Sequence, residues 1–165
     1  MSQEFVIRPA LPSDAAVVAE FNQRLALETE DLRLDPATLR SGVEAVLKDP
    51  SKGVYFVAEA EGRVVGQCSI TFEWSDWRDG NFWWLQSVYV DAAWRARGIF
   101  RGLYDHVRTA AKAAGVVGLR LYVEETNTTA QAVYARRGMH RTGYQVFEEV
   151  WPLSERRLAA RTPTN

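Results

Sequence analysis

The chain has 165 residues, of which 47% are hydrophobic and 25% charged, with a formal net charge of −1. This length and balance are typical of one globular domain with a buried core. The near-neutral charge argues against binding to nucleic acid or to an anionic membrane through the overall field, and the single cysteine excludes an internal disulfide.

The sequence carries no targeting or membrane signal that we recognise. The start M-S-Q-E-F lacks the basic and apolar regions of a signal peptide, and no apolar run approaches the ~20 residues that span a bilayer. We therefore expect a cytoplasmic protein in which residues 1–151 form one domain and residues 152–165 a polar tail. One cysteine (Cys68) and two isolated histidines (His106 and His140) predict no metal site, and Cys68, in the apolar run V-V-G-Q-C-S-I, is expected to be buried and inert.

The first third of the chain predicts one strand and two helices. A short strand begins at Phe5 and stops at Pro9. Ser13 or Asp14 is a good N-cap for a helix to about Glu28, because apolar residues then recur at helical spacing. Pro36, after Asp35, is typical of the first position of a second helix, which runs to about Lys48.

The middle of the chain predicts antiparallel strands. Residues 55–60 and 63–72 are strands joined by the two-residue turn Glu61-Gly62. A longer turn, E-W-S-D-W-R-D-G-N, precedes a third strand over residues 82–90.

The last third predicts helices that alternate with strands. A helix spans residues 98–114 and a strand residues 119–123. Asn127 caps a helix to Arg137, and one or two closing strands reach about Val150. Hairpins followed by a β-α-β unit predict an α/β or α+β fold with a mixed sheet.

The segment W-R-A-R-G-I-F-R-G-L, where a strand leads into a long helix, is a candidate anion site. A helix N-terminus has unpaired N–H groups and partial positive charge, so it can bind a pyrophosphate. Gly98 permits close backbone approach, and Arg95, Arg97 and Arg101 add positive charge. From the spacing alone, an ordinary turn with a solvated basic face explains the segment equally well.

Asn127 and Tyr134 are a second candidate pair. They are seven residues apart, or two helical turns, so they share one face of the helix about 10 Å apart along its axis. That face can run beside an extended ligand. Taken singly, Asn127 is explained as an N-cap and Tyr134 as a core aromatic with a wet hydroxyl.

Together these segments resemble two motifs of the GNAT acetyltransferases. W-R-A-R-G-I-F-R-G-L is similar to motif A, [QR]-x-x-G-x-[GA], and N-T-T-A-Q-A-V-Y-A-R-R-G-M is similar to motif B. The resemblance covers about residues 5 to 150. It implies an α/β (α+β) GNAT fold with a mixed, mostly antiparallel sheet of six or seven strands and about four helices. It also implies that the two central parallel strands splay apart.

The resemblance further implies that the protein uses acetyl-CoA as cosubstrate, without a metal. Backbone groups of Val88, Tyr89 and Val90, near a bulge, would bind the pantetheine arm together with Asn127, and Tyr134 would lie beside the thioester sulfur. The pyrophosphate would be wrapped by Arg95, Ala96, Arg97, Gly98, Ile99, Phe100 and Arg101. Phe100 departs from the motif, which has Gly or Ala there, so its side chain is expected to point into the core.

Acetyl transfer to an amine needs an oxyanion donor, an acid and a neutral amine. The backbone near Val88 is the candidate donor, and Tyr134 is the candidate general acid because its hydroxyl carries a proton at pH 7. The resemblance places Gln86 at the position of a glutamate that many family members have, and a glutamine side chain cannot accept the proton. Glu124 is the candidate base, with Glu125 or Glu73 as alternatives, and the amine can also arrive neutral.

The resemblance assigns the acceptor side to the first two helices and the turn before the central strand. The candidate residues there are Glu28, Glu73, Trp74, Trp77 and Gln86. Carboxylates and indole faces suit a small cationic amine. A solvated loop with tryptophans in the core or in a homodimer contact explains them equally well, although part of the cluster over residues 74–84 should be exposed. A protein or peptide acetyltransferase and a non-catalytic acyl-CoA-binding module remain alternatives.

Overall fold

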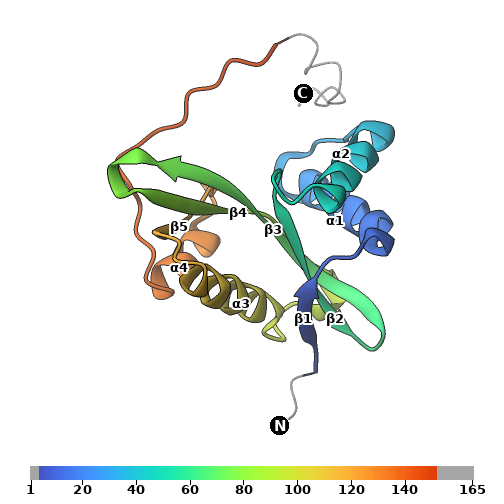
Figure 1. Ribbon diagram of the computed structural model, residues 1–165. Helices are drawn as coiled ribbons and strands as arrows, with labels where there is room; N and C mark the ends of the chain where they lie inside the picture. Colours follow the sequence, from blue (N-terminus) through green and yellow to red (C-terminus); the bar gives the residue numbers. More distant parts are fainter. Residues whose placement is uncertain (1–3, 152–165) are drawn as a thin grey trace.

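The computed structural model describes residues 4–151, which form one mixed sheet with helices on both faces (Figure 1). The strands are β1 (Val6–Pro9), β2 (Val54–Ala60), β3 (Arg63–Ser75), β4 (Gly80–Val90) and β5 (Gly118–Leu121). The helices are α1 (Ala15–Glu30), α2 (Pro36–Lys48), α3 (Ile99–Ala113) and α4 (Thr128–Arg136). Short 3-10 turns are η1 (Pro12–Asp14), η2 (Asp76–Arg78) and η3 (Ala92–Trp94).

The strand order follows the chain, β1-β2-β3-β4-β5. The first three pairings are antiparallel, and only β4 and β5 run parallel. The mixed, mostly antiparallel sheet and the helical elements were therefore predicted correctly, with boundaries that shift by a few residues. The hairpin of β3 and β4 is longer than predicted, because residues 73–75 extend β3.

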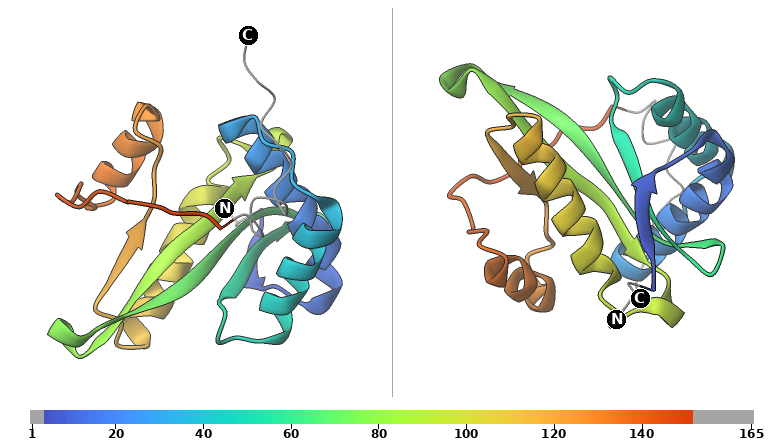
Figure 2. Two further views of the ribbon diagram at one scale, coloured as in Figure 1. Left: turned by 90° about the horizontal axis from the view of Figure 1, so that it is seen from above. Right: turned by 60° about the horizontal axis from the view of Figure 1, so that its bottom comes forward.

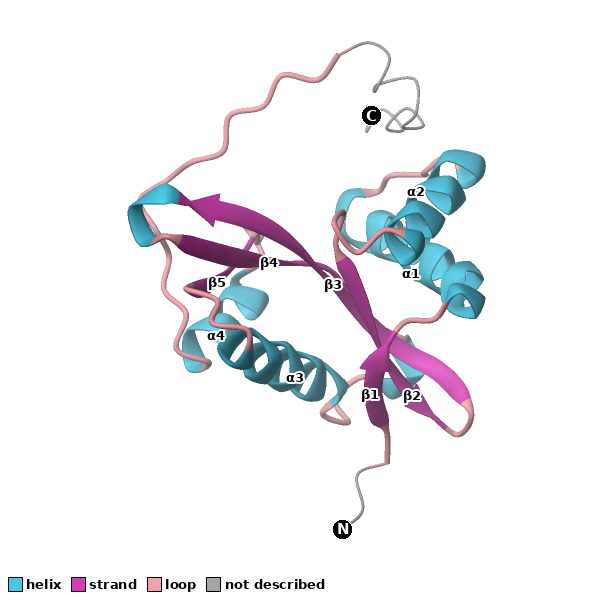
Figure 3. Ribbon diagram, in the orientation of Figure 1, coloured by secondary structure: helices cyan, strands magenta, loops and turns pink. Residues whose placement is uncertain are grey.

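The predicted count of six or seven strands is wrong for the described chain, which has five. The closing strands expected before Val150 are absent: after α4, residues 140–151 form an extended loop without secondary structure (Figure 3). A strand needs a neighbour to hydrogen-bond with, and within residues 4–151 this loop has none. The polar tail predicted from Pro152 lies outside the described residues.

The helices form two layers, one on each face of the sheet (Figure 2). Helices α1 and α2 cover the face of Tyr55 and Val57, where a small core includes Val18 and Val43. Helix α3 covers the opposite face, where the larger core includes Leu85 and Leu103. None of the helices within residues 4–151 is long and apolar enough to cross a membrane.

Asp14 and Asp35 illustrate two ways in which a polar residue starts a helix. Helix α2 begins at Pro36 as predicted, and Asp35 caps it, because its carboxylate accepts from the Thr38 N–H at 2.8 Å. Asp14 also stands at a helix start, but it is buried and its Oδ2 accepts from the Leu11 N–H at 2.7 Å and from Arg8 Nη1 at 2.8 Å. Asp14 therefore joins β1 to α1 rather than capping the helix.

Cys68 lies in the larger core with 1% of its surface exposed, as predicted. Burial raises the pKa of its thiol to about 12, because a thiolate loses its hydration there.

We predict that Cys68 does not react with iodoacetamide in the folded protein. At pH 8 a thiol with that pKa holds only about 10⁻⁴ of its population as the reactive thiolate. Intact mass spectrometry should find no adduct under native conditions and one adduct after unfolding in urea. Rapid labelling of the native protein would contradict the burial of this side chain.

Candidate functional site

The site is built around an irregularity in β4. Gln67 of β3 lies opposite Tyr89 of β4, but Ser69 lies opposite Gln86, so β4 has one extra residue in this stretch. Ser87 takes a left-handed backbone with φ of 50°. This is a β-bulge, and it stands where the resemblance implied one.

Two polar side chains of β3 stabilise the bulge by hydrogen bonds to its backbone. Ser69 Oγ donates to the Gln86 carbonyl at 3.3 Å, and Gln67 Nε2 donates to the Ser87 carbonyl at 3.3 Å. Gln67 is fully buried, and its Nε2 also donates to Asn22 Oδ1 at 2.8 Å. These bonds replace ladder bonds that the extra residue disrupts.

Beyond the bulge β4 and β5 no longer pair. Their register runs from Phe82 opposite Gly118 to Leu85 opposite Leu121, where β5 ends. Strand β4 continues to Val90 along β3 alone. Val88 and Val90 therefore lie on an edge of β4 that has no partner strand in the described chain. Its backbone groups are available to a ligand, except for the Val90 carbonyl, which accepts from Arg95 Nε.

The start of α3 is the second part of the site. Gly98 caps this helix with φ of 83°, and Ala96 just before it is also left-handed, with φ of 63°. Within residues 4–151 the backbone N–H groups of Gly98 to Arg101 donate to no backbone or side-chain acceptor. A Cβ at Gly98 would meet nothing within 4 Å. The turn thus presents a row of unpaired donors with open space beside Gly98, which fits an anion such as a pyrophosphate.

Two of the three predicted arginines stand near this turn. Arg97 lies over the Trp94 ring, 4.7 Å from its centroid. Arg101 is 73% exposed and lies 3.7 Å from Asp105 one turn further along α3. A shallow hollow here is lined by Phe5, Arg97, Gly98, Arg101, Gly102 and Asp105.

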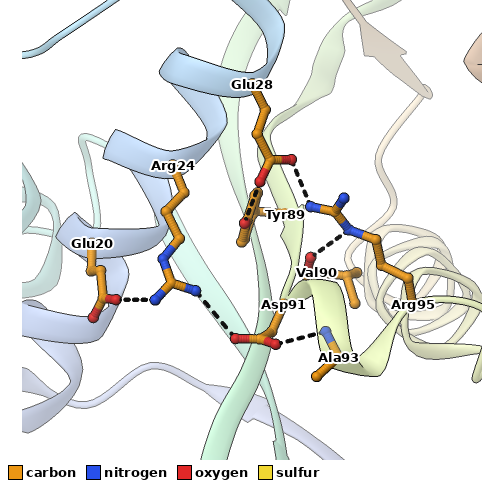
Figure 4. Close-up of polar contacts among 8 residues, drawn as sticks. All are labelled: Glu20, Arg24, Glu28, Tyr89, Val90, Asp91, Ala93 and Arg95. Carbon is orange, nitrogen blue, oxygen red and sulfur yellow. Dashed lines mark hydrogen bonds and ion pairs between the residues drawn. The ribbon is translucent and has the colours of Figure 1, made fainter.

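Arg95 points instead toward α1 (Figure 4). Its Nη2 donates to Glu28 Oε2 at 2.6 Å and its Nε to the Val90 carbonyl at 3.1 Å. The Tyr89 hydroxyl donates to the other oxygen of Glu28 at 2.8 Å. In this arrangement the Arg95 side chain is paired with Glu28, so its charge does not reach the anion turn and only its backbone belongs to that turn.

A second arginine–carboxylate contact, between Arg24 and Asp91, is drawn beside the Arg95–Glu28 contact in Figure 4. Arg24 pairs with Glu20 on its own helix and donates to Asp91 Oδ2 at 3.3 Å, and Asp91 Oδ1 accepts from the Ala93 N–H at 2.9 Å. Two arginine–carboxylate contacts therefore tie α1 to the end of β4 and to η3. They hold the turn before α3 in place.

The Glu28 carboxylate is already satisfied by these neighbours. Partial burial raises its pKa, but the hydrogen bonds from Tyr89 and Arg95 outweigh burial and leave the pKa below its usual value. Glu28 is therefore ionised at neutral pH, and its charge is balanced by Arg95.

Helix α4 begins at the Asn127 cap and places Tyr134 beside the first turn of α3. Asn127 caps α4, with Oδ1 accepting from the Ala130 N–H at 3.0 Å, so only its amide NH₂ remains for a ligand. Phe100 packs against the larger core as predicted, and its ring lies edge-on to Tyr134 with 5.9 Å between centroids. Burial raises the pKa of the Tyr134 hydroxyl, which forms no hydrogen bond within residues 4–151.

The predicted bases are already engaged by other groups. Glu124 is exposed, and its Oε2 accepts from the Thr126 hydroxyl and from the Thr126 N–H at 2.8 Å. These bonds lower its pKa. Glu125 is exposed and pairs with Arg141 at 3.2 Å. A carboxylate with a lowered pKa is a weaker base, which counts against Glu124 in that role.

Glu73 and Gln86 lie together on the sheet face opposite α3. Glu73 Oε2 accepts from Trp84 Nε1 at 2.9 Å and from Arg120 Nη1 at 2.6 Å. The bond from Trp84, followed by that from Arg120, lowers the Glu73 pKa. Gln86 Nε2 donates to Thr71 Oγ1 at 2.7 Å.

An aromatic pair lies on the same face. The Trp84 ring stacks on Tyr122 with centroids 4.5 Å apart and planes 29° apart. Tyr122 is 59% exposed, so this pair forms a partly open platform beside Glu73 and Gln86.

The other two predicted acceptor residues are not part of this platform. Trp77 lies in η2 at the tip of the β3–β4 hairpin and is 84% exposed. Trp74 is also exposed, but it neighbours Glu73 in β3 and therefore faces the other side of the sheet. The expected exposure of part of the tryptophan cluster is confirmed.

Sequence reasoning missed the residues that support the bulge and complete the platform. Gln67 and Asn22 hold the bulge, and Arg120 and Tyr122 flank Trp84. Polar residues at alternate positions of the apolar run V-V-G-Q-C-S-I were the available signal for Gln67. Arg120 and Tyr122, two residues apart after a predicted strand start, were the signal for the platform.

The arrangement combines a candidate anion site with an unpaired strand edge and a tyrosine hydroxyl that has no hydrogen-bond partner within residues 4–151. Among residues 4–151 no three His, Cys, Asp or Glu side chains are grouped to hold a metal ion. The geometry therefore fits an extended anionic ligand that enters at α3 and runs between the diverging ends of β4 and β5.

Comparison with known proteins gives a family match. The model of the "Acetyltransferase (GNAT) family" matches residues 18–139. The search of curated proteins gave no match.

Solved structures with this fold are numerous. A possible acetyltransferase from Clostridium difficile 630 is 42% identical, with 89% of this chain and 97% of that chain covered and a TM-score of 0.84. A GCN5-related N-acetyltransferase from Ralstonia eutropha JMP134 is 21% identical, with 88% and 98% covered and a TM-score of 0.72. Glucosamine-6-phosphate N-acetyltransferase from Arabidopsis thaliana is 19% identical, with 88% and 97% covered and a TM-score of 0.69. The last two are similar in fold.

We predict that the bulge makes position 87 sensitive to side-chain shape. Ser87→Val should lose about 1–2 kcal/mol of unfolding free energy, because a left-handed backbone brings Cβ close to the next carbonyl and a β-branched residue tolerates this poorly. Ser87→Gly should be as stable as the parent or more stable by up to ~1 kcal/mol. Urea denaturation measures both changes.

Ser75→Val is the matched control, because Ser75 has an extended backbone with φ of −112° at the far end of β3. It should change stability by less than about 0.5 kcal/mol. Equal stability of the Ser87→Val and Ser87→Gly variants would contradict the left-handed bulge.

Proposed function

Because the chain belongs to the acetyltransferase (GNAT) family, we propose that it is an acetyl-CoA-dependent N-acetyltransferase that acts on a primary amine. The observation that carries the proposal is the run of unpaired backbone N–H groups from Gly98 to Arg101, beside the free edge of β4. A site for a CoA thioester must bind an anion, the pyrophosphate, and an extended chain, the pantetheine arm.

The residues of the anion turn suit the pyrophosphate of CoA. The N–H groups at the start of α3 would donate to its oxygens, and Arg97 and Arg101 would add positive charge. Ala96, Ile99 and Phe100 would contribute backbone only, since Phe100 packs against the core. The pantetheine would pair with the free edge of β4 at Val88 to Val90 and would accept from the Asn127 amide.

We propose direct attack in a ternary complex. The amine nitrogen forms a bond to the thioester carbonyl carbon, and negative charge develops on the carbonyl oxygen. A backbone N–H at the bulge, near Val88, would stabilise that charge. The C–S bond then breaks, and the Tyr134 hydroxyl donates its proton to the leaving thiolate while the amine loses one to solvent. The raised pKa of Tyr134 keeps the hydroxyl protonated at neutral pH.

No carboxylate is proposed as an essential base. The pKa values of Glu124 and Glu73 are both lowered by hydrogen bonds, which makes each a poor acceptor for an amine proton. We propose that the amine enters neutral, or loses its proton through water to one of these groups.

We propose the face of Trp84 and Tyr122 as the acceptor site, with Glu73 and Gln86 as its polar groups. Glu28 and Glu73 are each balanced by an arginine, so they supply little free negative charge. Indole and phenol faces attract a small cationic amine without a free carboxylate. A protein or peptide acceptor would need a longer groove than this platform, and we favour the small amine.

We predict that Gly98→Asp weakens acetyl-CoA binding. The substitution places a negative charge among the unpaired N–H groups, where it competes with the pyrophosphate and repels it. Isothermal calorimetry should find Kd raised at least tenfold. Gly62→Asp is the matched control, because Gly62 also has a positive φ (71°) and open space around its Cβ but lies in the β2–β3 turn. Equal affinity in the parent and the Gly98→Asp variant would remove the pyrophosphate assignment.

We predict that Tyr134→Phe slows acetyl transfer and leaves acetyl-CoA affinity nearly unchanged. Loss of a general acid costs about 10²–10⁴-fold in rate, which corresponds to ~3–5 kcal/mol of barrier. The loss belongs in kcat rather than in binding. Single-turnover measurement with acetyl-CoA and an amine acceptor found in a broad amine screen is the direct test, because slow product release would mask the effect in steady-state kcat.

Tyr144→Phe is the control, since Tyr144 is 80% exposed. It should keep the parent rate. A Tyr134→Phe variant with full single-turnover rate across the pH range would show that this tyrosine is structural. A parent protein that binds acetyl-CoA and acetylates no amine would favour a binding module instead.

A further inference from the structure

Gln67 of β3 is a fully buried polar side chain to which the proposed reaction assigns no task. Its Nε2 donates to the Ser87 carbonyl at 3.3 Å and to Asn22 Oδ1 at 2.8 Å. Its Oε1 is buried and has no hydrogen-bond partner among the described residues. Within residues 4–151 the side chain of Gln67 therefore acts only as a donor.

The neighbours of Gln67 fix the orientation of its amide. Asn22 Nδ2 donates to the Tyr55 hydroxyl at 3.0 Å, which leaves Asn22 Oδ1 facing Gln67. A Gln67 amide turned by half a rotation would place its oxygen against the oxygens of Asn22 and Ser87, and both bonds would be lost. An apolar residue of similar size would avoid the cost of an unpaired buried oxygen. What the amide supplies at this position is therefore donation to the bulge.

The Ser87 carbonyl belongs to the same peptide group as the Val88 N–H. No peptide bond among residues 4–151 is cis, and in a trans peptide the C=O and N–H bonds point in opposite directions. A bond that holds the Ser87 carbonyl toward Gln67 therefore holds the Val88 N–H away from Gln67 and β3. The opposite edge of β4 is the one that β5 leaves open, because their pairing ends at Leu85.

The same bond makes the Val88 N–H a stronger donor. A peptide carbonyl that accepts a hydrogen bond is polarised, and the polarisation increases the partial positive charge on the N–H of that peptide. Ser87 and Val88 have no opposing residue in the register of β3 and β4. The side chain of Gln67 therefore does for this peptide what a ladder bond does for its neighbours.

We propose that Gln67 is a positioning residue for acetyl transfer. Its amide, held by Asn22, orients and polarises the peptide of Ser87 and Val88 so that the Val88 N–H donates to the thioester carbonyl oxygen. Negative charge develops on that oxygen when the amine attacks, and a donor aligned in advance stabilises it. Gln67 is fully buried, so it acts through the backbone rather than by contact with the reactants. The inference rests on the proposed function, because it concerns the same site and the same reaction.

Infrared difference spectroscopy of bound acetyl-CoA tests the proposal without an acceptor amine. In the parent, donation to the thioester oxygen should lower the stretching frequency of an isotope-labelled carbonyl relative to free acetyl-CoA. In Gln67→Met, which has a similar length and no donor, the frequency should return toward the free value. Calorimetry should find the acetyl-CoA Kd changed by less than about threefold, because the pyrophosphate and pantetheine contacts remain.

Single-turnover acetyl transfer measures the effect on the reaction itself. Removal of a whole oxyanion donor costs about 10²–10³-fold in rate, and misalignment of the donor in Gln67→Met should cost roughly tenfold or more. Asn22→Ala removes the acceptor that holds the amide but leaves Gln67 in place. It should change the frequency and the rate in the same direction by a smaller amount, and it decides the question if Gln67→Met does not fold.

Val107→Ala is the matched control for a loss of stability. Val107 is fully buried in the larger core against α3, on the face of the sheet opposite Asn22 and α1. It should lose stability and keep the parent frequency. The parent frequency in Gln67→Met, or in Asn22→Ala where the first variant does not fold, overturns the proposal, and so does an equal change in Val107→Ala.

The parent protein separates failure of this inference from failure of the proposed function. A parent that binds acetyl-CoA with no lowered carbonyl frequency overturns the role of Gln67 and leaves acetyl transfer standing. A parent that does not bind acetyl-CoA in calorimetry removes the proposed function and this inference with it.

Discussion

The bulge at Ser87 is the constraint on which the site depends. Without the extra residue, β4 would stay parallel to β5 beyond Leu85, and the edge at Val88 would be filled by ladder bonds. With the extra residue, β4 diverges from β5 but stays paired with β3, and the chain then continues into η3 and α3. The same local change therefore opens the strand edge and positions the helix whose N-terminus presents the unpaired donors.

The bulge is held from two sides. Gln67 and Ser69 donate hydrogen bonds to the carbonyls of Ser87 and Gln86. On the other side, the Glu28–Arg95 and Arg24–Asp91 contacts hold the end of β4 against α1. Exposed ion pairs contribute little to stability singly. Their importance here is geometric, because they fix the orientation of a turn that contains two left-handed residues, Ala96 and Gly98.

Local patterns predicted most of this fold, and non-local pairing accounts for the errors. The start of α2 at Pro36, the Glu61-Gly62 turn and the start of α3 depend on neighbouring residues, and all three were predicted correctly. The bulge was expected only from the family resemblance, because its supports come from β3 and α1. The direction of Arg95 depends on Glu28 in α1, 67 residues away. The prediction of closing strands was wrong for the same reason: G-Y-Q-V-F-E-E-V-W has strand propensity, but propensity does not supply a partner strand, and within residues 4–151 this segment has none.

The carboxylates near the proposed acceptor face show why the number of acidic residues in a sequence does not give the electrostatic potential at a site. Glu28 and Glu73 are ionised, since hydrogen bonds lower the pKa of each, but Arg95 and Arg120 stand within 2.6 Å and cancel most of their potential. What remains unbalanced on that face is the negative potential of the Trp84 and Tyr122 rings. Recognition of a cation there would therefore depend on ring geometry and contact more than on charge, and it would be less sensitive to salt than an acidic pocket.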